Sequence, residues 1–283
     1  MSDKVITSYK GFDKNMQCRG FQYEVGKEYE MDGEIKCCNR GFHACKSPME
    51  VWDYYDILNS RYAEVEQSGK IEEEKNSTKV CSSRIKIKAE LKLADFINIG
   101  VEWLKDITSP SKVKTDGALN GNGDRKKKIG SSGDSAKIGS SGYSAQIGSS
   151  GDSAQIGSSG DSAKIGSSGD SAQIGSSGDS AQIGSSGDYA KIGSSGDYAK
   201  IGSSGDYAKI GSTGEDSVIM CAGNSSRAKA KVGSWITLAE WKWSDEKKRN
   251  VPVYVKTEYV DGENIKADTC YQLKNGKFVE VTE

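Results

Sequence analysis

The sequence predicts three regions of different fold class: an α+β N-terminal domain, a parallel β-solenoid of nonapeptide repeats and a small all-β C-terminal capping domain. Three observations lead to this prediction. A nine-residue phrase repeats through the middle of the chain, helical and alternating strand patterns precede it, and short strand-like segments follow it. The predicted boundaries are residues 1–106 for the first domain, 107–120 for a linker, 121–228 for the solenoid and 229–283 for the cap.

The repeat places isoleucine every nine residues from Ile129 to Ile210, within the phrase G-S-S-G-[D/Y]-[S/Y]-A-[K/Q]-I. Alanine and isoleucine are two residues apart, so they share one face of a strand while the Lys or Gln between them points away. We expect the glycines, after Ile and before Asp, to allow the φ values that turn the chain at each corner.

Two nonapeptides would form one coil of 18 residues, and coils would stack about 4.8 Å apart through parallel hydrogen bonds. Ten units would then give about five coils and a rod about 25 Å long. A flexible Gly/Ser linker is the first alternative, but a linker has no reason to keep Ile and Ala in fixed phase. A calcium-binding roll is the second, but its Asp stands two positions after a Gly, whereas Asp134 and Asp188 directly follow one.

The outward positions of the repeat supply the candidate binding residues. Early units carry Ser with Lys or Gln there, and the last three carry Tyr with Lys. A solvent-facing Tyr is a common anchor in protein interfaces, although stacked Tyr rings would equally stiffen the sheet. With two units per coil, Tyr189 and Tyr207 would lie on one face and Tyr198 on the other. The candidate binding residues are Tyr189, Lys191, Tyr198, Lys200, Tyr207 and Lys209.

The flanking regions have recognisable local patterns. Ser47 to Glu50 has the form of a capping box with Pro at the first helical position, and residues 94–106 form a second helical pattern. Residues 84–93 alternate as a strand, residues 251–260 are strand-like, and Asn275-Gly276 predicts a hairpin turn. Because an open solenoid end exposes unpaired strand edges, we expect the tail to act as a cap.

Chemistry, if present, would centre on the single histidine, His43. With Cys18, Cys38 and Cys45 it could complete a tetrahedral zinc site, but there is no C-x-x-C pair among them, which favours buried thiols and a hydrogen-bonded histidine instead. His43 and Cys45 could also form a catalytic dyad if they share one face of a strand. No other motif supports an activated nucleophile, so we expect no catalytic residue, no metal and no cofactor.

Composition limits the classes of partner and the cellular compartment. A formal net charge of −1 favours neither nucleic acid nor an anionic membrane, and no apolar run is long enough for a transmembrane helix. Seven dispersed cysteines fit the reduced thiols of a cytosol better than a disulfide framework. We therefore expect a cytoplasmic protein that binds neither membranes nor nucleic acid directly.

Three N-terminal phrases are distinctive: CRGFQYEVGK at 18–27, GFHAC at 41–45 and RYAEVE at 61–66. Together they resemble an N-terminal domain found in phage and prophage proteins of unknown function, where nonapeptide arrays and a small β tail follow it. The arrays of those proteins carry small residues where this chain has Ala and Ile. The resemblance implies a phage or mobile-element origin and action in the cytoplasm of a bacterial host. It supplies no catalytic residues.

The function predicted from these features is a non-catalytic binding protein that engages a host protein through its solenoid and N-terminal domain. The phage resemblance suggests an inhibitor of bacterial immunity, an anti-CRISPR type of protein whose partner would be a defence ribonucleoprotein. One alternative is a structural component of a virion or fibre, for which a homo-oligomer would be expected. Another is a small-molecule-binding or enzymatic N-terminal domain centred on His43 and Cys45.

Overall fold

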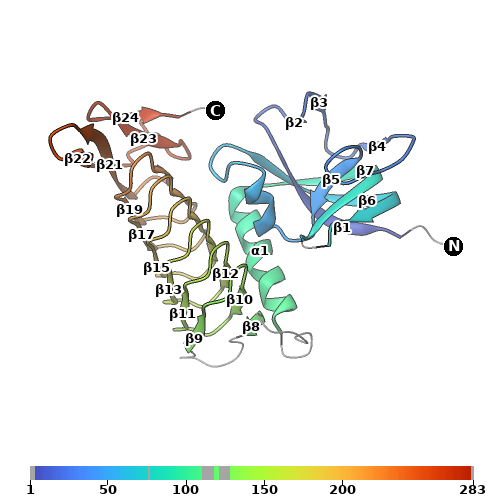
Figure 1. The fold of residues 1–283 in the computed structure, drawn as a ribbon, viewed down its shortest axis with the longest axis horizontal. Helices are drawn as coiled ribbons and strands as arrows, with labels where there is room; N and C mark the ends of the chain where they lie inside the picture. Colours follow the sequence, from blue (N-terminus) through green and yellow to red (C-terminus); the bar gives the residue numbers. More distant parts are fainter. Residues whose placement is uncertain (1–3, 76, 110–117, 121–127, 282–283) are drawn as a thin grey trace. The chain divides into compact units, whose positions relative to one another are not determined.

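The structure, a computed structural model, describes residues 4–75, 77–109, 118–120 and 128–281 (Figure 1). The chain divides into two compact units, Met1–Gly100 and Val101–Glu283. Among the described residues, helix α1 (Leu93–Ile107) is the one α-helix, and it matches the predicted helical pattern at 94–106. Most of the predicted linker, residues 110–117, lies outside the described residues.

The first unit is built on an antiparallel sheet with the strand order β4-β7-β5-β1-β6. Strand β7 also pairs with β6, so β7, β5, β1 and β6 form a closed ring. The two long strands pair along most of their length and contain register shifts, which let the sheet bend round on itself. The strands are β1 (Ile6–Phe12), β4 (Glu28–Glu30), β5 (Phe42–Cys45), β6 (Arg61–Glu73) and β7 (Lys79–Leu91), with a separate hairpin of β2 (Gln17–Cys18) and β3 (Phe21–Gln22).

The predicted first helix is only a 3-10 turn, η1 (Met49–Asp53). Only half of the predicted capping box forms: the Ser47 hydroxyl oxygen accepts the Glu50 N–H at 3.4 Å, but the Glu50 carboxylate accepts the Thr78 N–H at 3.0 Å and the Ser77 hydroxyl. The Ser47 N–H donates to Thr78 Oγ1 at 3.0 Å. The Glu50 carboxylate therefore makes tertiary contacts with Ser77 and Thr78 instead of capping a helix at Ser47. The N-terminal region is β-rich rather than evenly α+β.

The second unit contains a parallel β-solenoid of about six turns across residues 128–238. Strands alternate between two sheets, here called the even sheet and the odd sheet (Figure 1). The even sheet contains β8 (Ala118–Asn120), β10 (Lys137–Ser140), β12 (Gln155–Ser158), β14 (Gln173–Ser176), β16 (Lys191–Ser194), β18 (Lys209–Ser212) and β20 (Arg227–Lys229). The odd sheet contains β9 (Lys128–Ser131), β11 (Gln146–Ser149), β13 (Lys164–Ser167), β15 (Gln182–Ser185), β17 (Lys200–Ser203), β19 (Val218–Cys221) and β21 (Trp235–Ser244).

The predicted 18-residue coil is confirmed by the register of both sheets. Ile138 pairs with Ile156 in the even sheet, and Ile147 pairs with Ile165 in the odd sheet. The repeat isoleucines and alanines are buried in a single continuous core. From Ser140 to Ser212 the first serine of each unit is also buried, because in Lys/Gln-Ile-Gly-Ser the isoleucine and serine share the inner face.

The glycine before each Asp does not supply the positive φ that we expected. The residue after Asp does so, as at Ser153 (φ 55°) and Tyr189 (φ 57°), a conformation that costs a non-glycine residue about 1–2 kcal/mol. The Ser153 N–H donates to the Asp170 carbonyl of the next coil at 2.8 Å, which holds this corner. Glycine is needed for space: a Cβ on Gly169 would lie 2.1 Å from the Gly151 carbonyl oxygen.

The Asp of each unit forms a ladder along the corner. Asp170 Oδ1 accepts the Asp188 N–H at 2.8 Å, and Asp152 Oδ1 accepts the Asp170 N–H at 2.8 Å. The same contact continues to Asp206, which accepts the Asn224 N–H at 2.6 Å. The position of Asp directly after Gly is therefore explained by backbone hydrogen bonding between coils.

Antiparallel strands follow the last coil in both sheets. Strand β22 (Arg249–Tyr259) pairs with β21 in the odd sheet, and β23 (Tyr271–Lys274) pairs with β20 in the even sheet. Strand β24 (Lys277–Glu280) completes the predicted hairpin, whose turn residues Asn275 and Gly276 both have positive φ, 50° and 68°. Such values are typical of the type I′ turn.

Replacing Gly169 by Ala should lower the free energy of unfolding by about 1–3 kcal/mol, because the new Cβ overlaps the backbone of the neighbouring coil. Gly166→Ala, three residues earlier, is the matched control, since a Cβ there meets no atom within 4 Å. Urea unfolding of both variants measures the difference. Equal stability of the two variants would contradict the close-approach explanation.

Candidate binding surface on the odd sheet

The outer face of the odd sheet carries two parallel rows of repeat residues. Because each strand pairs in register with the next, the first position of every strand falls in one row and the third in another. The first row is Lys128, Gln146, Lys164, Gln182 and Lys200, and the second is Gly130, Gly148, Gly166, Gly184 and Gly202. A Cβ at any of these five glycines would meet nothing within 4 Å, so the glycine row is open to solvent.

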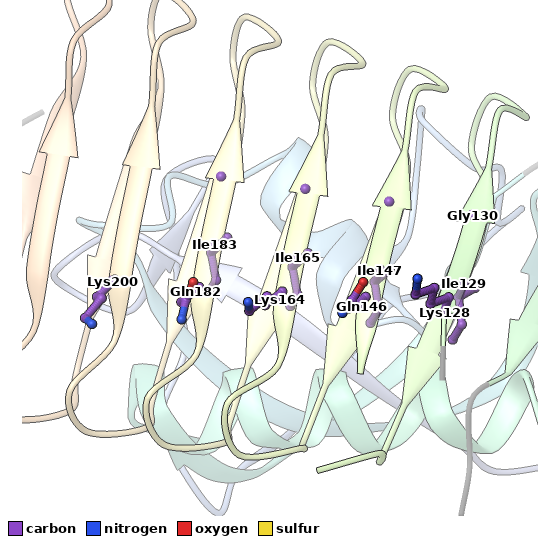
Figure 2. Close-up of a pocket in the computed structure, with 13 residues that line it drawn as sticks. Lys128, Ile129, Gly130, Gln146, Ile147, Lys164, Ile165, Gln182, Ile183 and Lys200 are labelled. Carbon is purple, nitrogen blue, oxygen red and sulfur yellow. The ribbon is translucent and has the colours of Figure 1, made fainter. Parts of the chain in front are cut away.

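These rows form a shallow groove with a volume of about 810 Å³ (Figure 2). The side chains in its wall alternate between ammonium and amide groups, and none of the described residues that line it has a carboxylate. Lysine recurs on every second coil, which places the charges about 9–10 Å apart along the sheet. The groove is therefore complementary to a surface rich in hydrogen-bond acceptors and negative charge.

The same rows become apolar beyond the groove. Val218 takes the place of the repeat lysine and pairs with Lys200 on one side and Trp235 on the other. Met220 takes the place of the repeat glycine, and Tyr259 follows Trp235 across β22. The Trp235 and Tyr259 ring centroids lie 5.0 Å apart at 51°.

We call these residues, together with Val255 on the same face of β22, the apolar patch. Its members are large apolar side chains with exposed fractions between 40% and 63%: Val218, Met220, Trp235, Val255 and Tyr259. Exposed large apolar side chains gathered on one face mark interaction sites on proteins, because fully covering one of them contributes about 1.5–3 kcal/mol. The odd sheet thus offers a cationic groove that leads into an aromatic anchor.

The even sheet differs on its first coils. Within the second unit, the last turns of α1 lie over its glycine row, since a Cβ on Gly139 would be 2.6 Å from Thr108 Oγ1 and one on Gly157 would be 3.0 Å from Leu104 Cδ1. Lys137 Nζ lies 5.3 Å from the Trp103 ring centroid. The glycine after each Ile therefore serves helix packing here, whereas on the odd sheet it leaves an open groove.

The structure distributes the predicted binding residues over different parts of the solenoid. Tyr189 and Tyr207 stack at one corner, with ring centroids 5.0 Å apart and planes 4° from parallel, as a two-unit coil predicts. Tyr198 is exposed at the other corner. Lys191 and Lys209 pair with each other on the even sheet, and Lys200 lies in the groove of the odd sheet. Of the six, Lys200 is the one in the surface described above.

Sequence reasoning missed the apolar patch. Val218 and Met220 replace Lys and Gly in what is otherwise the strand pattern K-I-G-S, and this break was a usable signal. Trp235 and Tyr259 could not be placed beside them from the sequence, because their alignment depends on the registers of β19 with β21 and of β21 with β22.

In the first unit, the four candidate zinc ligands serve separate contacts. His43 Nε2 accepts the Cys38 N–H at 2.9 Å, and Cys18 Sγ lies 2.9 Å from the Tyr55 hydroxyl. Cys45 is buried, and burial raises the pKa of its thiol. Within the part of the chain that the structure describes, no group of three or more His, Cys, Asp or Glu side chains could hold a metal ion.

His43 and Cys45 are also poorly suited to act as a dyad. Burial, and then the positive charges of Lys10, Arg19 and Lys79, lower the pKa of His43. Its Nε2 already accepts a backbone N–H, while Cys45 keeps its proton. The absence of catalytic residues stays a prediction.

Comparison with known proteins identifies one region. Residues 6–99 match a family model described as a domain of unknown function, DUF7666. This region is a DUF7666 domain. It covers the sheet of the first unit and ends within α1, so the solenoid lies outside it. No curated protein and no solved structure matches the chain. No helix in the described residues has the length and apolar character needed to cross a membrane.

Replacing Tyr189 by Ser should cost about 0.5–1.5 kcal/mol of stability, because it removes one ring of the Tyr189–Tyr207 stack. Serine already occupies this column in earlier coils, at Ser153 and Ser171. Tyr198→Ser is the control and should cost less, since Ser180 and Asp216 are its column neighbours. Thermal unfolding measures both, and equal losses would argue against the stack.

The lowered pKa of His43 predicts loss of stability in acid. The unfolded chain binds the proton near the ordinary pKa of about 6.5, whereas the folded chain resists it, so stability falls as pH drops below that value. His43→Gln keeps an acceptor for the Cys38 N–H and should flatten the curve between about pH 6.5 and 5. Urea midpoints across this range provide the measurement, and parallel curves for both proteins would refute it.

Proposed function

We propose that the chain is a non-catalytic binding protein that engages a host protein through the outer face of the odd sheet. The observation that carries the proposal is the continuity of the Lys/Gln row with the apolar patch, at the paired residues Lys200, Val218 and Trp235. A rigid parallel sheet presents this row without the entropy cost of ordering a loop. The DUF7666 domain would supply a second contact region.

The surface defines the chemistry of the partner. Exposed Trp and Tyr rings are frequent hot spots, so the partner should offer an apolar pocket or knob to Trp235 and Tyr259. Beside it, the partner should carry acidic groups that face the lysine row. Such charges contribute more to the association rate and to orientation than to affinity.

The phage-type resemblance and the free cysteines support a partner inside a bacterial host. On that basis, a defence ribonucleoprotein such as a CRISPR effector is the specific partner class that we propose. Contact through the protein component, rather than the nucleic acid, fits a net charge of −1. A fibre role is less well supported, because antiparallel strands follow the last coil in both sheets.

The test begins with capture of a partner from bacterial lysate by the intact chain, followed by affinity measurements with the purified partner. Trp235→Ala should weaken binding about 30-fold, the effect of losing a hot spot worth about 2 kcal/mol. Lys164→Gln should weaken it less, and this loss should shrink at high salt.

Lys191→Gln is the matched control, because it makes the same change on the even sheet and Gln is native in that row at Gln173. It should leave the affinity unchanged. Two outcomes would reject the odd sheet as the binding face. One is that Lys164→Gln and Lys191→Gln change the affinity equally, and the other is that the Lys164 and Trp235 variants both bind with the native affinity.

A further inference from the structure

The first unit buries a lysine, Lys10, whose side chain lies among aromatic rings. Only 3% of Lys10 is exposed. Its Nζ lies 5.5 Å from the Phe12 ring centroid, 5.6 Å from that of Tyr23 and 5.8 Å from that of Tyr55. An aromatic surround of this kind favours a cation but does not replace an anionic partner.

The polar contacts of Lys10 are a thiol, a phenol hydroxyl and a backbone carbonyl. Nζ lies 3.4 Å from Cys18 Sγ, 3.4 Å from the Tyr55 hydroxyl and 3.0 Å from the His43 carbonyl oxygen. The ionisable groups around it include Cys18, Cys45, Arg19, His43 and Tyr55, and none of these described neighbours is a carboxylate. A buried ammonium without an anion costs several kcal/mol, so burial favours the neutral amine of Lys10.

Each member of this pair can act as a nucleophile. Burial lowers the pKa of Lys10 and so favours the neutral amine, which has a lone pair. Beside it lies the Cys18 sulfur, 2.9 Å from the Tyr55 hydroxyl oxygen. The thiolate is the form of cysteine that reacts with peroxide.

Cys18 is also placed differently from the buried thiols Cys45 and Cys81. It is half-buried on the β2–β3 hairpin, next to a turn in which Arg19 and Gly20 have positive φ. Cys45 and Cys81 are buried, and burial raises the pKa of both thiols, that of Cys81 to about 12. A small oxidant can therefore approach Cys18 while those two thiols stay protonated.

We propose that Cys18 and Lys10 form a redox-modification site at which hydrogen peroxide couples the two side chains through a sulfur–nitrogen bond. The Cys18 thiolate attacks one peroxide oxygen, the O–O bond breaks and hydroxide leaves. Sulfur is oxidised by two electrons to a sulfenic acid, and the peroxide is reduced. The lone pair of Lys10 Nζ then attacks sulfur, the S–O bond breaks, and the departing hydroxide takes a proton from the amine. One thiol, one amine and one H₂O₂ give one S–N bond and two waters.

The bond would join β1 to the β2–β3 hairpin inside the DUF7666 domain. Lysine has a long, flexible side chain, so rotation about its χ angles can close the 3.4 Å between Nζ and Sγ. A thiol reductant would reverse the coupling, because a thiolate can attack the sulfur and release the amine. The domain would then have two covalent states set by peroxide and thiol levels.

Peroxide treatment of the intact chain, followed by mass spectrometry of a digest, tests the proposal. We expect a linked pair of peptides that contain Lys10 and Cys18, lighter by two hydrogens than their sum and separated by dithiothreitol. Cys38→Ser, which removes another thiol close to a lysine, Lys79, is the matched control and should leave the linkage intact. The same chain unfolded in urea should give no linkage.

Lys10→Met separates the two steps. It should abolish the linkage but still allow peroxide to oxidise Cys18 to the sulfenic acid, because the variant keeps the thiol and lacks the amine. Absence of the linkage in the folded native chain would overturn the proposal, and so would a linkage that also forms in urea. A linked pair that retains one added oxygen would overturn the direct sulfur–nitrogen bond.

Discussion

The solenoid depends on one constraint, the parallel backbone pairing of each coil with the coil 18 residues later. Adjacent strands lie about 4.7–4.9 Å apart, and at the corners the backbones approach closely enough to exclude a Cβ. That spacing explains three successive positions of each unit. The glycine leaves room for the neighbouring backbone, the Asp side chain accepts a backbone N–H of the next coil, and the residue after Asp takes a positive φ. The isoleucine and alanine core is thin, so much of the cohesion must come from these repeated contacts between neighbouring coils.

The same constraint turns a short repeat into extended surfaces. Equivalent positions of successive coils lie side by side, so the side chains at one position of the repeat form a row along the sheet. On the odd sheet this gives alternating ammonium and amide groups beside an open glycine row. A change at the end of the array, to Val218 and Met220, is enough to switch that row from polar to apolar. Specificity can therefore reside in the few units where the repeat decays.

The first unit follows a different principle, because its contacts are between residues far apart in the chain. Glu50 is drawn to Thr78, and Lys10 is enclosed by aromatic residues and Cys18. The closed ring of strands and the β2–β3 hairpin bring the Lys10 amine within 3.4 Å of the Cys18 thiol. Their chemistry is set by burial and proximity rather than by a local motif.

The sequence by itself determined the solenoid, its 18-residue coil, α1 and the Asn275-Gly276 hairpin, because each depends on periodicity or on the preferences of adjacent residues. The tertiary structure decided what local patterns cannot specify. It reduced the Ser47–Glu50 helix to a single turn, gave the corner glycines a steric role and placed Trp235 and Tyr259 at the end of the lysine row. These outcomes depend on strand registers and long-range contacts, which arise only when distant segments pack together.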